Sequence, residues 1–320
     1  MPVGGPVIKL SNGVKMPAVG LGSWLSAPGE AKAAVKTAVK HGYRLIDTAS
    51  VYANEEDVGE AIQELIADGV VKREELFVTT KAWAHEFVPG KLEAALRASL
   101  KRLRLDYVDL YLAHVPTAFN DDMSVALNDV SVEDIWKEFD HVYKLGLAKA
   151  VGVSNWNNDQ IERVLKLGLT PVHNSQVELH LYFPQHSHAA FCKEHGVTVT
   201  SYATLGSPGR VNHRMPNRKP LNWLPAAPSD LKDPLVAALA DKYKRTPAQV
   251  LLRYALDRGF AIIPKSVNAD RIKANFELFD FKLTDDDITL LETTNQENRL
   301  FLQEFMNGHR EDSFFNERRG

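Results

Sequence analysis

The sequence predicts an α/β fold in which eight parallel strands close into a (β/α)8 barrel, and three observations support this class. Short β-rich apolar runs alternate with longer segments of helical period. Eight such runs occur, and the alternation fits within the roughly 250 residues typical of this kind of barrel. The 320-residue chain is 44% hydrophobic and 25% charged, so one well-packed barrel domain spanning residues 1–320 is expected.

The eight strand candidates share a short apolar run that ends near a turn or a helical segment. They are residues 18–22, 43–47, 76–81, 108–114, 148–154, 172–178, 197–203 and 260–265. Repeated strand-helix units favour a parallel sheet with right-handed crossovers, which suits closure into a barrel. An open doubly wound sheet is the alternative, but GLGSWL after the first strand lacks the third glycine of a GxGxxG motif.

Amphipathic segments separate the strand candidates. The clearest are residues 56–69, 91–103, 132–146 and 247–259. Several begin at Pro, Ser or Asp and several end at Gly, as helix capping requires. These segments are therefore predicted to be the helices that surround the barrel.

Three segments fall outside the repeat. Residues 7–16 contain an Asn-Gly pair, which predicts a tight hairpin that closes the barrel floor. Residues 206–232 are rich in Gly, Pro and Asn, and the tail at about 295–320 carries four phenylalanines without a clean period. We expect the tail to be a loop that covers substrate, with a packed extension of the core as an equally good alternative.

Composition narrows the class of partner. A net charge of −3 argues against a general binder of nucleic acid or anionic membrane, because such proteins carry a basic face. A secretory leader and long apolar runs are absent, so a cytoplasmic protein is expected. Cys192 stands alone, which excludes an internal disulfide. Four histidines within residues 180–195 suggest a metal site. No ligand spacing such as HExxH occurs, so no bound metal is expected.

Four polar residues lie at strand ends on the face where barrel enzymes place their active site. Asp47 ends the second strand candidate, Tyr52 follows it, Lys81 ends the third and His114 ends the fourth. A cation beside a phenol stabilises the phenolate, so Lys81 is expected to lower the pKa of Tyr52. A buried lysine needs a carboxylate partner, which Asp47 supplies, and His114 can orient a carbonyl oxygen. The set predicts a general acid that faces a substrate carbonyl.

Later strand ends offer a binding site for a hydride donor. Residues 153–156, Gln176, Tyr202 and residues 263–275 open on the same face. Within the last segment, two cations and a serine near a helix start make a plausible phosphate site, although an ordinary basic helix start is an equal alternative.

With these residues assembled, the chain resembles the aldo-keto reductases over nearly its whole length. The segments DTASVYANEEDVG, LYLAHVP, GVSNW and IPKSVNADRIKAN are similar to that family's recurrent segments in order and spacing. The resemblance implies a barrel that binds NADP(H) without a Rossmann motif and reduces aldehydes and ketones to alcohols, as an enzyme of the aldehyde reductase type. Carried over by position, Asp47, Tyr52, Lys81 and His114 form the catalytic tetrad, with Tyr52 as the proton donor.

The resemblance also implies which residues hold the cofactor. Those expected at the nicotinamide are Ser154, Asn155 and Gln176 on the carboxamide, with Tyr202 stacked on the ring. Those expected at the pyrophosphate and adenosine end are Leu205, Ser207, Lys265, Ser266, Asn268, Arg271 and Asn275. Paired cations suit a 2′-phosphate, so NADPH is predicted in preference to NADH.

The chain departs from the family pattern in several places. Val115 stands where many members have tryptophan, so a wider substrate pocket is expected there, with Trp24, Val51 and Trp83 as its other walls. Gly209 lies where an acidic residue often clamps the cofactor. Ala203 and Ala274 likewise replace expected polar residues, so faster cofactor release is predicted.

Two other functions stay open at this point. A barrel aldolase would form a Schiff base on a strand-end lysine, and Lys81 and Lys265 are the candidates. A recruited non-enzymatic protein, such as a lens or channel-associated protein, is the third reading, although the complete tetrad speaks against it. The resemblance favours a monomer that acts on small carbonyl compounds.

Overall fold

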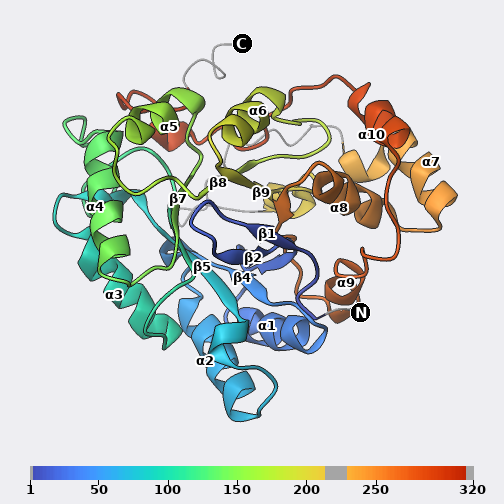
Figure 1. The fold of residues 1–320 in the computed structure, drawn as a ribbon, viewed down its shortest axis with the longest axis horizontal. Helices are drawn as coiled ribbons and strands as arrows, with labels where there is room; N and C mark the ends of the chain where they lie inside the picture. Colours follow the sequence, from blue (N-terminus) through green and yellow to red (C-terminus); the bar gives the residue numbers. More distant parts are fainter. Residues whose placement is uncertain (1–2, 213–228, 315–320) are drawn as a thin grey trace.

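The computed structural model describes residues 3–212 and 229–314. The central parts of the 206–232 loop and the last six residues of the predicted substrate tail therefore lie outside the described residues. One eight-stranded sheet forms the centre of the molecule, and all of its neighbouring strands pair in parallel (Figure 1). Its strands are β3 (Gly20–Gly22), β4 (Leu45–Asp47), β5 (Phe77–Ala82), β6 (Leu110–Ala113), β7 (Val151–Ser154), β8 (Asn174–Glu178), β9 (Thr198–Tyr202) and β10 (Ala261–Ile262).

Two isolated parallel bridges join the first and last strands and complete the ring. Val19 pairs with Ile262, and Gly22 pairs with Lys265. Each predicted strand overlaps one observed strand, so the (β/α)8 barrel is confirmed. The strand predicted at 260–265 is cut to two residues, because Pro264 has no N–H to donate to a sheet.

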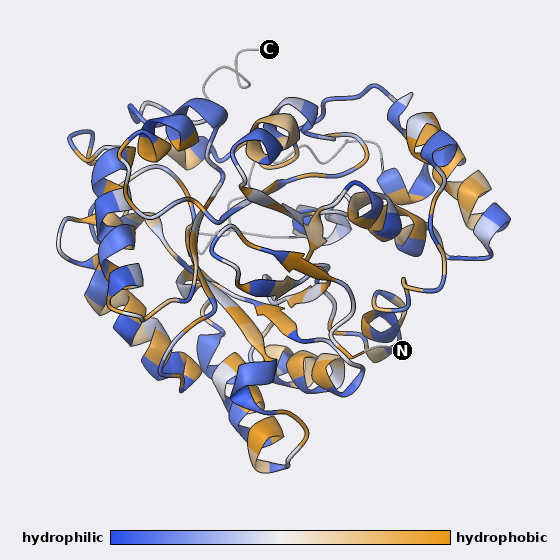
Figure 2. Cartoon of the chain, in the orientation of Figure 1, coloured by the Kyte–Doolittle hydropathy of each residue, from blue (hydrophilic) through white to orange (hydrophobic). Residues whose placement is uncertain are grey.

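Helices surround the barrel between successive strands (Figure 1). They are α1 (Glu30–Lys40), α2 (Glu55–Ala67), α3 (Leu92–Leu103), α4 (Val132–Lys144), α5 (Asn158–Leu165), α6 (His186–Glu194), α8 (Pro247–Asp257) and α9 (Ala269–Ala274). Local sequence explains their ends: Ser131 caps α4 in a capping box with Asp134, and Thr246 caps α8 just before Pro247. Apolar residues face the strands and polar residues face solvent, as Figure 2 shows by hydropathy.

Two helices fall outside the strand-helix alternation. They are α7 (Pro234–Tyr243), which follows the 206–232 loop, and α10 (Asp285–Glu292). Both pack with α8 around a small apolar cluster that is separate from the main core. None of the helices among the described residues is long and apolar enough to cross a membrane.

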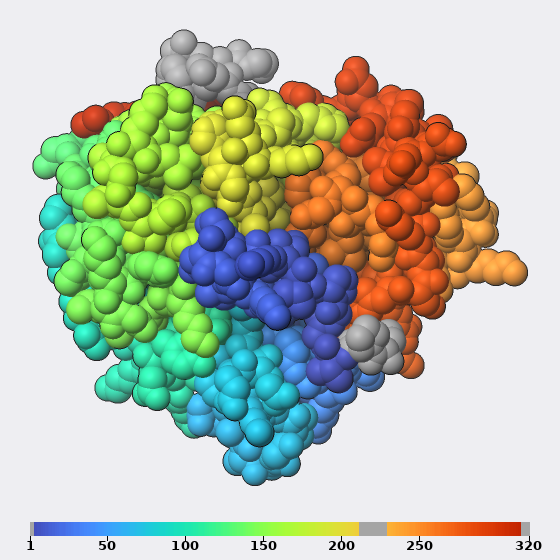
Figure 3. Space-filling model, viewed as in Figure 1, coloured from blue at the N-terminus to red at the C-terminus, as the bar shows by residue number. Residues whose placement is uncertain are grey.

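The N-terminal hairpin closes one end of the barrel, as predicted. Strands β1 (Val7–Lys9) and β2 (Lys15–Pro17) pair antiparallel, and they cover the centre of the face shown in Figure 3. Leu10 and Met16 from the hairpin pack inside the barrel against Leu45 and Phe77. Because this apolar cluster fills the floor, the opening for ligands lies at the opposite end, where the strands finish.

Candidate active site

The four tetrad residues meet at the carboxyl ends of neighbouring strands. Asp47 ends β4, Lys81 lies near the end of β5 and His114 follows β6, while Tyr52 ends a short 3-10 turn after β4. Lys81 Nζ lies 3.5 Å from the Tyr52 hydroxyl, and His114 Nε2 lies 3.4 Å from the same oxygen. The phenol is therefore within reach of both a cation and an imidazole.

Lys81 is fully buried and its ammonium is surrounded by oxygen atoms. It donates to Asp47 Oδ1 at 2.5 Å and to the Thr48 carbonyl oxygen at 2.9 Å. The second oxygen of Asp47 accepts a hydrogen bond of 2.8 Å from Gln176 Nε2. Both carboxylate oxygens of Asp47 are thus engaged, which holds the ion pair in a single geometry.

The turn that carries Tyr52 is fixed on both sides. Ser50 Oγ donates to Glu86 Oε2 at 2.8 Å, which ties the start of the turn to the loop after β5. Asn54 Nδ2 donates to the Ser23 carbonyl oxygen at 2.9 Å, which ties the end of the turn to the loop after β3. These contacts place the phenol without requiring it to pack on a neighbouring helix.

The electrostatics differ from expectation at Tyr52. Burial raises the pKa of the phenol well above its usual value, and the charge of Asp47 raises it further. Lys81 was expected to lower it, but the ammonium lies closer to Asp47 than to the phenol, so its charge is largely balanced. Burial lowers the pKa of Lys81, and Asp47 opposes this shift. The unliganded site therefore keeps the phenol protonated.

His114 is a neutral imidazole. Burial, followed by the nearby charge of Lys81, lowers its pKa well below its usual value. The ring of Trp83 meets it edge-on with 5.0 Å between centroids. A neutral imidazole can accept or donate one hydrogen bond at Nε2, so this residue can orient a carbonyl oxygen beside Tyr52.

The residues expected at the nicotinamide lie next to the tetrad and contact one another. Asn155 Nδ2 donates to the His114 carbonyl oxygen at 2.8 Å, and its Oδ1 accepts from the Tyr202 hydroxyl at 2.7 Å. Asn155 has φ of 61°, a left-handed conformation that asparagine tolerates better than most residues. Ser154 is the last residue of β7 and Gln176 lies in the middle of β8. Both side chains are buried. This polar group borders the barrel opening.

The residues expected at the far end of the cofactor lie in two segments. Leu205 is half-buried against the main core and against the small cluster formed with α7, α8 and α10. Ser207 follows β9 in a left-handed conformation. The others lie after β10 and around α9: Lys265, Ser266, Asn268, Arg271 and Asn275. Asn268 caps α9 by accepting from the Arg271 N–H at 3.0 Å.

The cation pair after β10 fits a phosphate. Lys265 and Arg271 are both exposed. Partial burial lowers the pKa of Lys265, the charge of Glu30 opposes this shift, and the charge of Arg271 adds to it. Lys265 Nζ donates to the Leu25 carbonyl oxygen at 3.1 Å. Neither cation forms an ion pair with a carboxylate of the described chain. Two neighbouring cations that repel one another suit a doubly charged 2′-phosphate.

Aromatic rings wall the opening above the tetrad. Trp83 lies 5.3 Å from Phe305 between ring centroids, and Trp24 meets Phe301 edge-on at 5.7 Å. Val51 is exposed, with 43% of its surface open. The described part of the C-terminal tail thus supplies two of the rings, while Met306 and Phe314 of the same tail are buried in the main apolar core.

Val115 is placed differently from expectation. It is fully buried and belongs to the main apolar core, so it does not face the opening. Phe119, which the sequence did not single out, is buried in the same core, and its ring lies 5.9 Å from that of Phe305 between centroids. Its only sequence signal was an aromatic residue five positions after His114.

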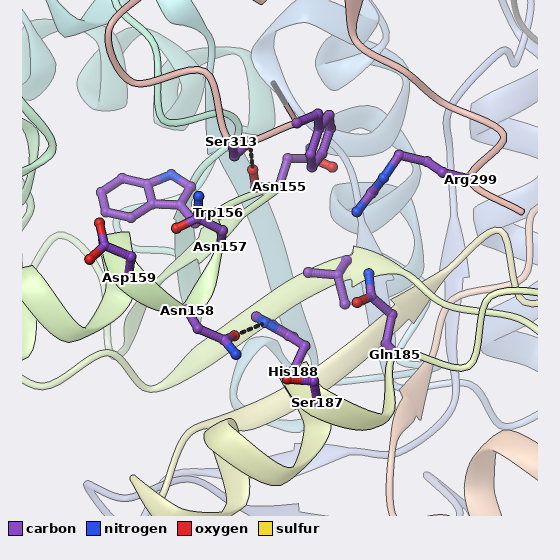
Figure 4. Close-up of a pocket in the computed structure, with 12 residues that line it drawn as sticks. Asn155, Trp156, Asn157, Asn158, Asp159, Gln185, Ser187, His188, Arg299 and Ser313 are labelled. Carbon is purple, nitrogen blue, oxygen red and sulfur yellow. Dashed lines mark hydrogen bonds between the residues drawn. The ribbon is translucent and has the colours of Figure 1, made fainter. Parts of the chain in front are cut away.

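A separate pocket of about 330 Å³ lies beside Asn155 and contains none of the tetrad residues (Figure 4). The starts of α5 and α6 line it, together with the C-terminal segment. Ser313 Oγ donates to the Asn155 carbonyl oxygen at 2.7 Å, and His188 Nδ1 lies 2.7 Å from Asn158 Oδ1. The chemistry of the candidate site is at the tetrad, because the charged and titratable groups gather there.

The clustered histidines serve separate contacts. His180 lies between the carboxylates of Glu178 and Asp230, while His188 contacts Ser175. Within the residues that the structure describes, no group of three or more possible ligands could hold a metal ion.

The chain matches known proteins over most of its length. A model of the family described as "Aldo/keto reductase family" matches residues 18–296. Aldo-keto reductase family 1 member A1-A from Danio rerio is 42% identical over 306 residues, covering 92% of this chain and 91% of the relative. The human member A1 is 40% identical over 300 residues, covering 90% and 89%.

Solved structures agree with these matches. An aldose reductase from Schistosoma japonicum superposes with a TM-score of 0.87 at 37% identity, covering 98% of this chain and 100% of the other. A Bombyx mori aldo-keto reductase in complex with NADP gives a TM-score of 0.88 at 36% identity, covering 98% and 99%. The chain therefore belongs to the aldo/keto reductase family, and its predicted NADP(H)-dependent reduction of carbonyl compounds is confirmed.

Proposed function

We propose that the chain reduces aromatic and other apolar aldehydes and ketones with NADPH, and that Tyr52 is the general acid. The observation that carries this proposal is the position of the Tyr52 hydroxyl, which lies within 3.5 Å of both Lys81 Nζ and His114 Nε2. A cofactor bound in the opening supplies a hydride to the carbonyl carbon. The residues of the chain supply the proton, the orientation and the walls.

Tyr52 gives up its proton as negative charge develops on the carbonyl oxygen. Its raised pKa keeps the phenol protonated until that moment. The phenolate that remains is stabilised by the Lys81 ammonium, which Asp47 keeps in place. His114 is neutral, so its Nε2 orients the carbonyl oxygen and does not compete with Tyr52 as the acid.

The polar group beside the tetrad orients the nicotinamide. Gln176 Nε2 is committed to Asp47, so its carbonyl oxygen is the acceptor available for a carboxamide N–H. Ser154 and Asn155 complete the carboxamide site, and the Tyr202 ring, held by its hydroxyl on Asn155, stacks on the nicotinamide. At the other end, Lys265 and Arg271 bind the 2′-phosphate, with Ser266, Asn268 and Asn275 around the adenosine.

The substrate class follows from the walls. Trp24, Trp83, Phe301 and Phe305 contribute apolar rings to these walls. A planar apolar carbonyl compound gains area and ring contacts there. Substrates with a bulky apolar group are therefore favoured over sugars.

The aldolase alternative fits the geometry poorly. Lys81 is fully buried and is held by Asp47 and Thr48 as an ammonium, whose protonated nitrogen has no lone pair with which to attack a carbonyl carbon. Lys265 lies outside the tetrad and contacts Leu25. We also infer a monomeric enzyme of the cytoplasm, in line with a single buried free cysteine, and sedimentation at micromolar concentration would test the monomer.

Substituting Tyr52 by Phe tests the proposal. The ring stays while the proton is removed, so kcat for an aromatic aldehyde should fall by roughly 10²- to 10⁴-fold with the Kd for NADPH little changed. Tyr107→Phe removes the same atom at the opposite end of the barrel, where the ring packs against Arg73, and should leave kcat unchanged. Tyr52→Phe activity close to that of the wild type would show that another group is the acid.

A further inference from the structure

A buried charged cluster lies beyond the tetrad on β8. We call Glu178, His180 and Asp230 the Glu178 cluster; their exposed fractions are 0%, 1% and 1%. Glu178 follows Gln176 by two positions on the same strand, so both side chains point to the same face. The cluster is therefore next to the cofactor-binding group but belongs to none of the roles described above.

His180 joins the two carboxylates. Its Nε2 lies 3.0 Å from Glu178 Oε1, and its Nδ1 lies 3.1 Å from Asp230 Oδ2. Burial lowers the pKa of His180, but the two carboxylates outweigh it and raise the pKa to about 9. Nε2 is hydrogen-bonded to Glu178, while Nδ1 faces Asp230 at ion-pair distance without hydrogen-bond geometry. A carboxylate on each side favours the imidazolium form of the ring.

One end of the cluster holds the substrate side of the site. Glu178 accepts hydrogen bonds from the backbone N–H groups of Leu300 at 2.6 Å and Phe301 at 3.0 Å. The Phe301 ring meets Trp24 and Tyr202 edge-on, with 5.7 Å between centroids in each case. Glu178 thus fixes the ring that stands between the substrate wall and the residue proposed to stack on the nicotinamide.

The other end holds the loop after β9. Asp230 begins a 3-10 turn at the end of that loop, and Gly206 lies at its start. A Cβ at Gly206 would come within 2.9 Å of Asp230 Oδ1, so the two ends of the loop are in contact at this carboxylate. Leu205 and Ser207, both expected at the cofactor, flank that glycine.

Burying three ionised groups is expensive, and apolar residues of similar volume would stabilise the fold as well. What the charges add is a fixed arrangement, because Glu178 has directional hydrogen-bond partners and the imidazolium attracts the Asp230 carboxylate at 3.1 Å. We propose that the Glu178 cluster is a positioning unit that connects the cofactor-side loop to Phe301, so that Asp230, which touches neither ligand, sets the preference for bulky over small carbonyl compounds. This inference rests on the proposed function for the identity of the wall.

The physical consequence of losing the Asp230 charge is specific. Without it, the imidazolium has one carboxylate partner, and its proton and orientation are less well defined. Glu178 then loses a fixed charged partner and holds Leu300 and Phe301 less tightly. A bulky aldehyde needs contact with the Phe301 ring, whereas propanal is too small to reach it. Losing the Asp230 charge should therefore lower kcat/KM for the bulky aldehyde more than for propanal.

The experiment compares Asp230→Asn with Asp241→Asn, which removes the same charge from an exposed position on α7. At saturating NADPH, kcat/KM is measured for 4-nitrobenzaldehyde and for propanal. For Asp230→Asn the ratio of the two should fall roughly tenfold, mainly through KM for the aromatic aldehyde. The ratio should stay at the wild-type value for Asp241→Asn.

A second readout is independent of catalysis. Hydrogen exchange at the Leu300 and Phe301 amides should speed up in Asp230→Asn and in Glu178→Gln, but not in Asp241→Asn. If Asp230→Asn is too unstable to purify, Glu178→Gln is assayed in its place with the same expected ratio. An unchanged aldehyde ratio with unchanged exchange overturns the inference. If the wild type reduces neither aldehyde but exchange at Leu300 and Phe301 still speeds up in Asp230→Asn, the proposed function is overturned. The structural connection between Asp230 and Phe301 is then still supported.

Discussion

The two ends of the barrel interior are built from the same strands but from opposite kinds of residue. At the floor, Leu45 of β4 and Phe77 of β5 pack against Met16 of the hairpin. At the open end, the same two strands present Asp47 and Lys81, joined as an ion pair. Two to four residues along a strand therefore separate an apolar plug from a reactive centre.

The difference shows how position along a strand decides what a substitution costs. Floor residues contribute apolar area and volume, so losses there are graded with the size of the cavity. Residues at the open end depend on partners, so removing one leaves another unpaired in a dry site. Floor substitutions should change stability alone, and substitutions at the open end should change both stability and rate.

The largest effect is expected for Lys81→Met. It leaves the Asp47 carboxylate buried with Gln176 as its remaining partner, so the free energy of unfolding should fall by about 3–5 kcal/mol and reduction should be abolished. Urea denaturation and NADPH oxidation measure the two effects. Lys91→Met breaks the exposed pair with Asp121 and should cost less than about 1 kcal/mol with normal activity. Equal losses in both variants would contradict the comparison.

A smaller and purely structural effect is expected for Leu45→Ala. The cavity left at the floor should lower the free energy of unfolding by about 2–5 kcal/mol, while kcat of the folded enzyme stays within about twofold of the wild type. Leu290→Ala is the control, because that side chain is 40% exposed. A large loss of kcat in Leu45→Ala would mean that the two ends of the strand are mechanically coupled.

The pH dependence of stability tests the Glu178 cluster. The pKa of His180 is about 9 in the folded protein and about 6.5 when unfolded, so its contribution is complete below about pH 6.5 and is lost as pH rises through about 9. The expected decrease is on the order of 3 kcal/mol and is measured by urea denaturation between these limits. Arg210 and Arg299 also face the two carboxylates and stay charged throughout this range. Asp230→Asn should flatten the slope, whereas a wild type with no slope would show that His180 is neutral.

The smallest effect is expected for Gly209→Asp, which adds an acid where the loop has none. A Cβ at Gly209 meets no atom within 4 Å, so the change should cost little stability. If the loop approaches the bound cofactor, a carboxylate opposite Lys265 should slow cofactor release by roughly two- to fivefold, the effect of one exposed ion pair. Stopped-flow fluorescence measures the rate, and Gly209→Asn controls for the added side chain. If Gly209→Asp releases the cofactor as fast as Gly209→Asn, an acid at position 209 does not clamp the cofactor.

Much of this arrangement was accessible from the sequence because it is local. Asp47, Lys81 and His114 each close an apolar run, and parallel strands bring their ends to one face whatever the loops do. The hairpin was equally clear from its Asn-Gly turn. Residue type and strand order were therefore enough to predict the tetrad as a group.

The remaining features depend on distances that a sequence does not encode locally. The pKa of Tyr52 depends first on how deeply the fold buries the phenol and then on its distance from the Asp47 charge. Val115 is fully buried in the main apolar core, which its place after His114 in the sequence does not indicate. Asp230 reaches His180 only after a long loop returns to β8, so its role was visible only in the folded chain.

The joint between β3 and β10 has a consequence for motion. Among the described residues, the strands at that joint are paired by two isolated bridges and the Lys265 bond to Leu25, and α1 packs against α9 outside them. A closed barrel separates most easily where its strand pairing is weakest. Here that place lies next to Lys265 and Arg271, the cations proposed to hold a phosphate. A dinucleotide bound at these cations would contact both sides of the β3–β10 joint and stabilise it. We expect amide exchange around Gly22 to slow more on saturation with NADP⁺ than exchange at the middle of β6 on the far side of the barrel.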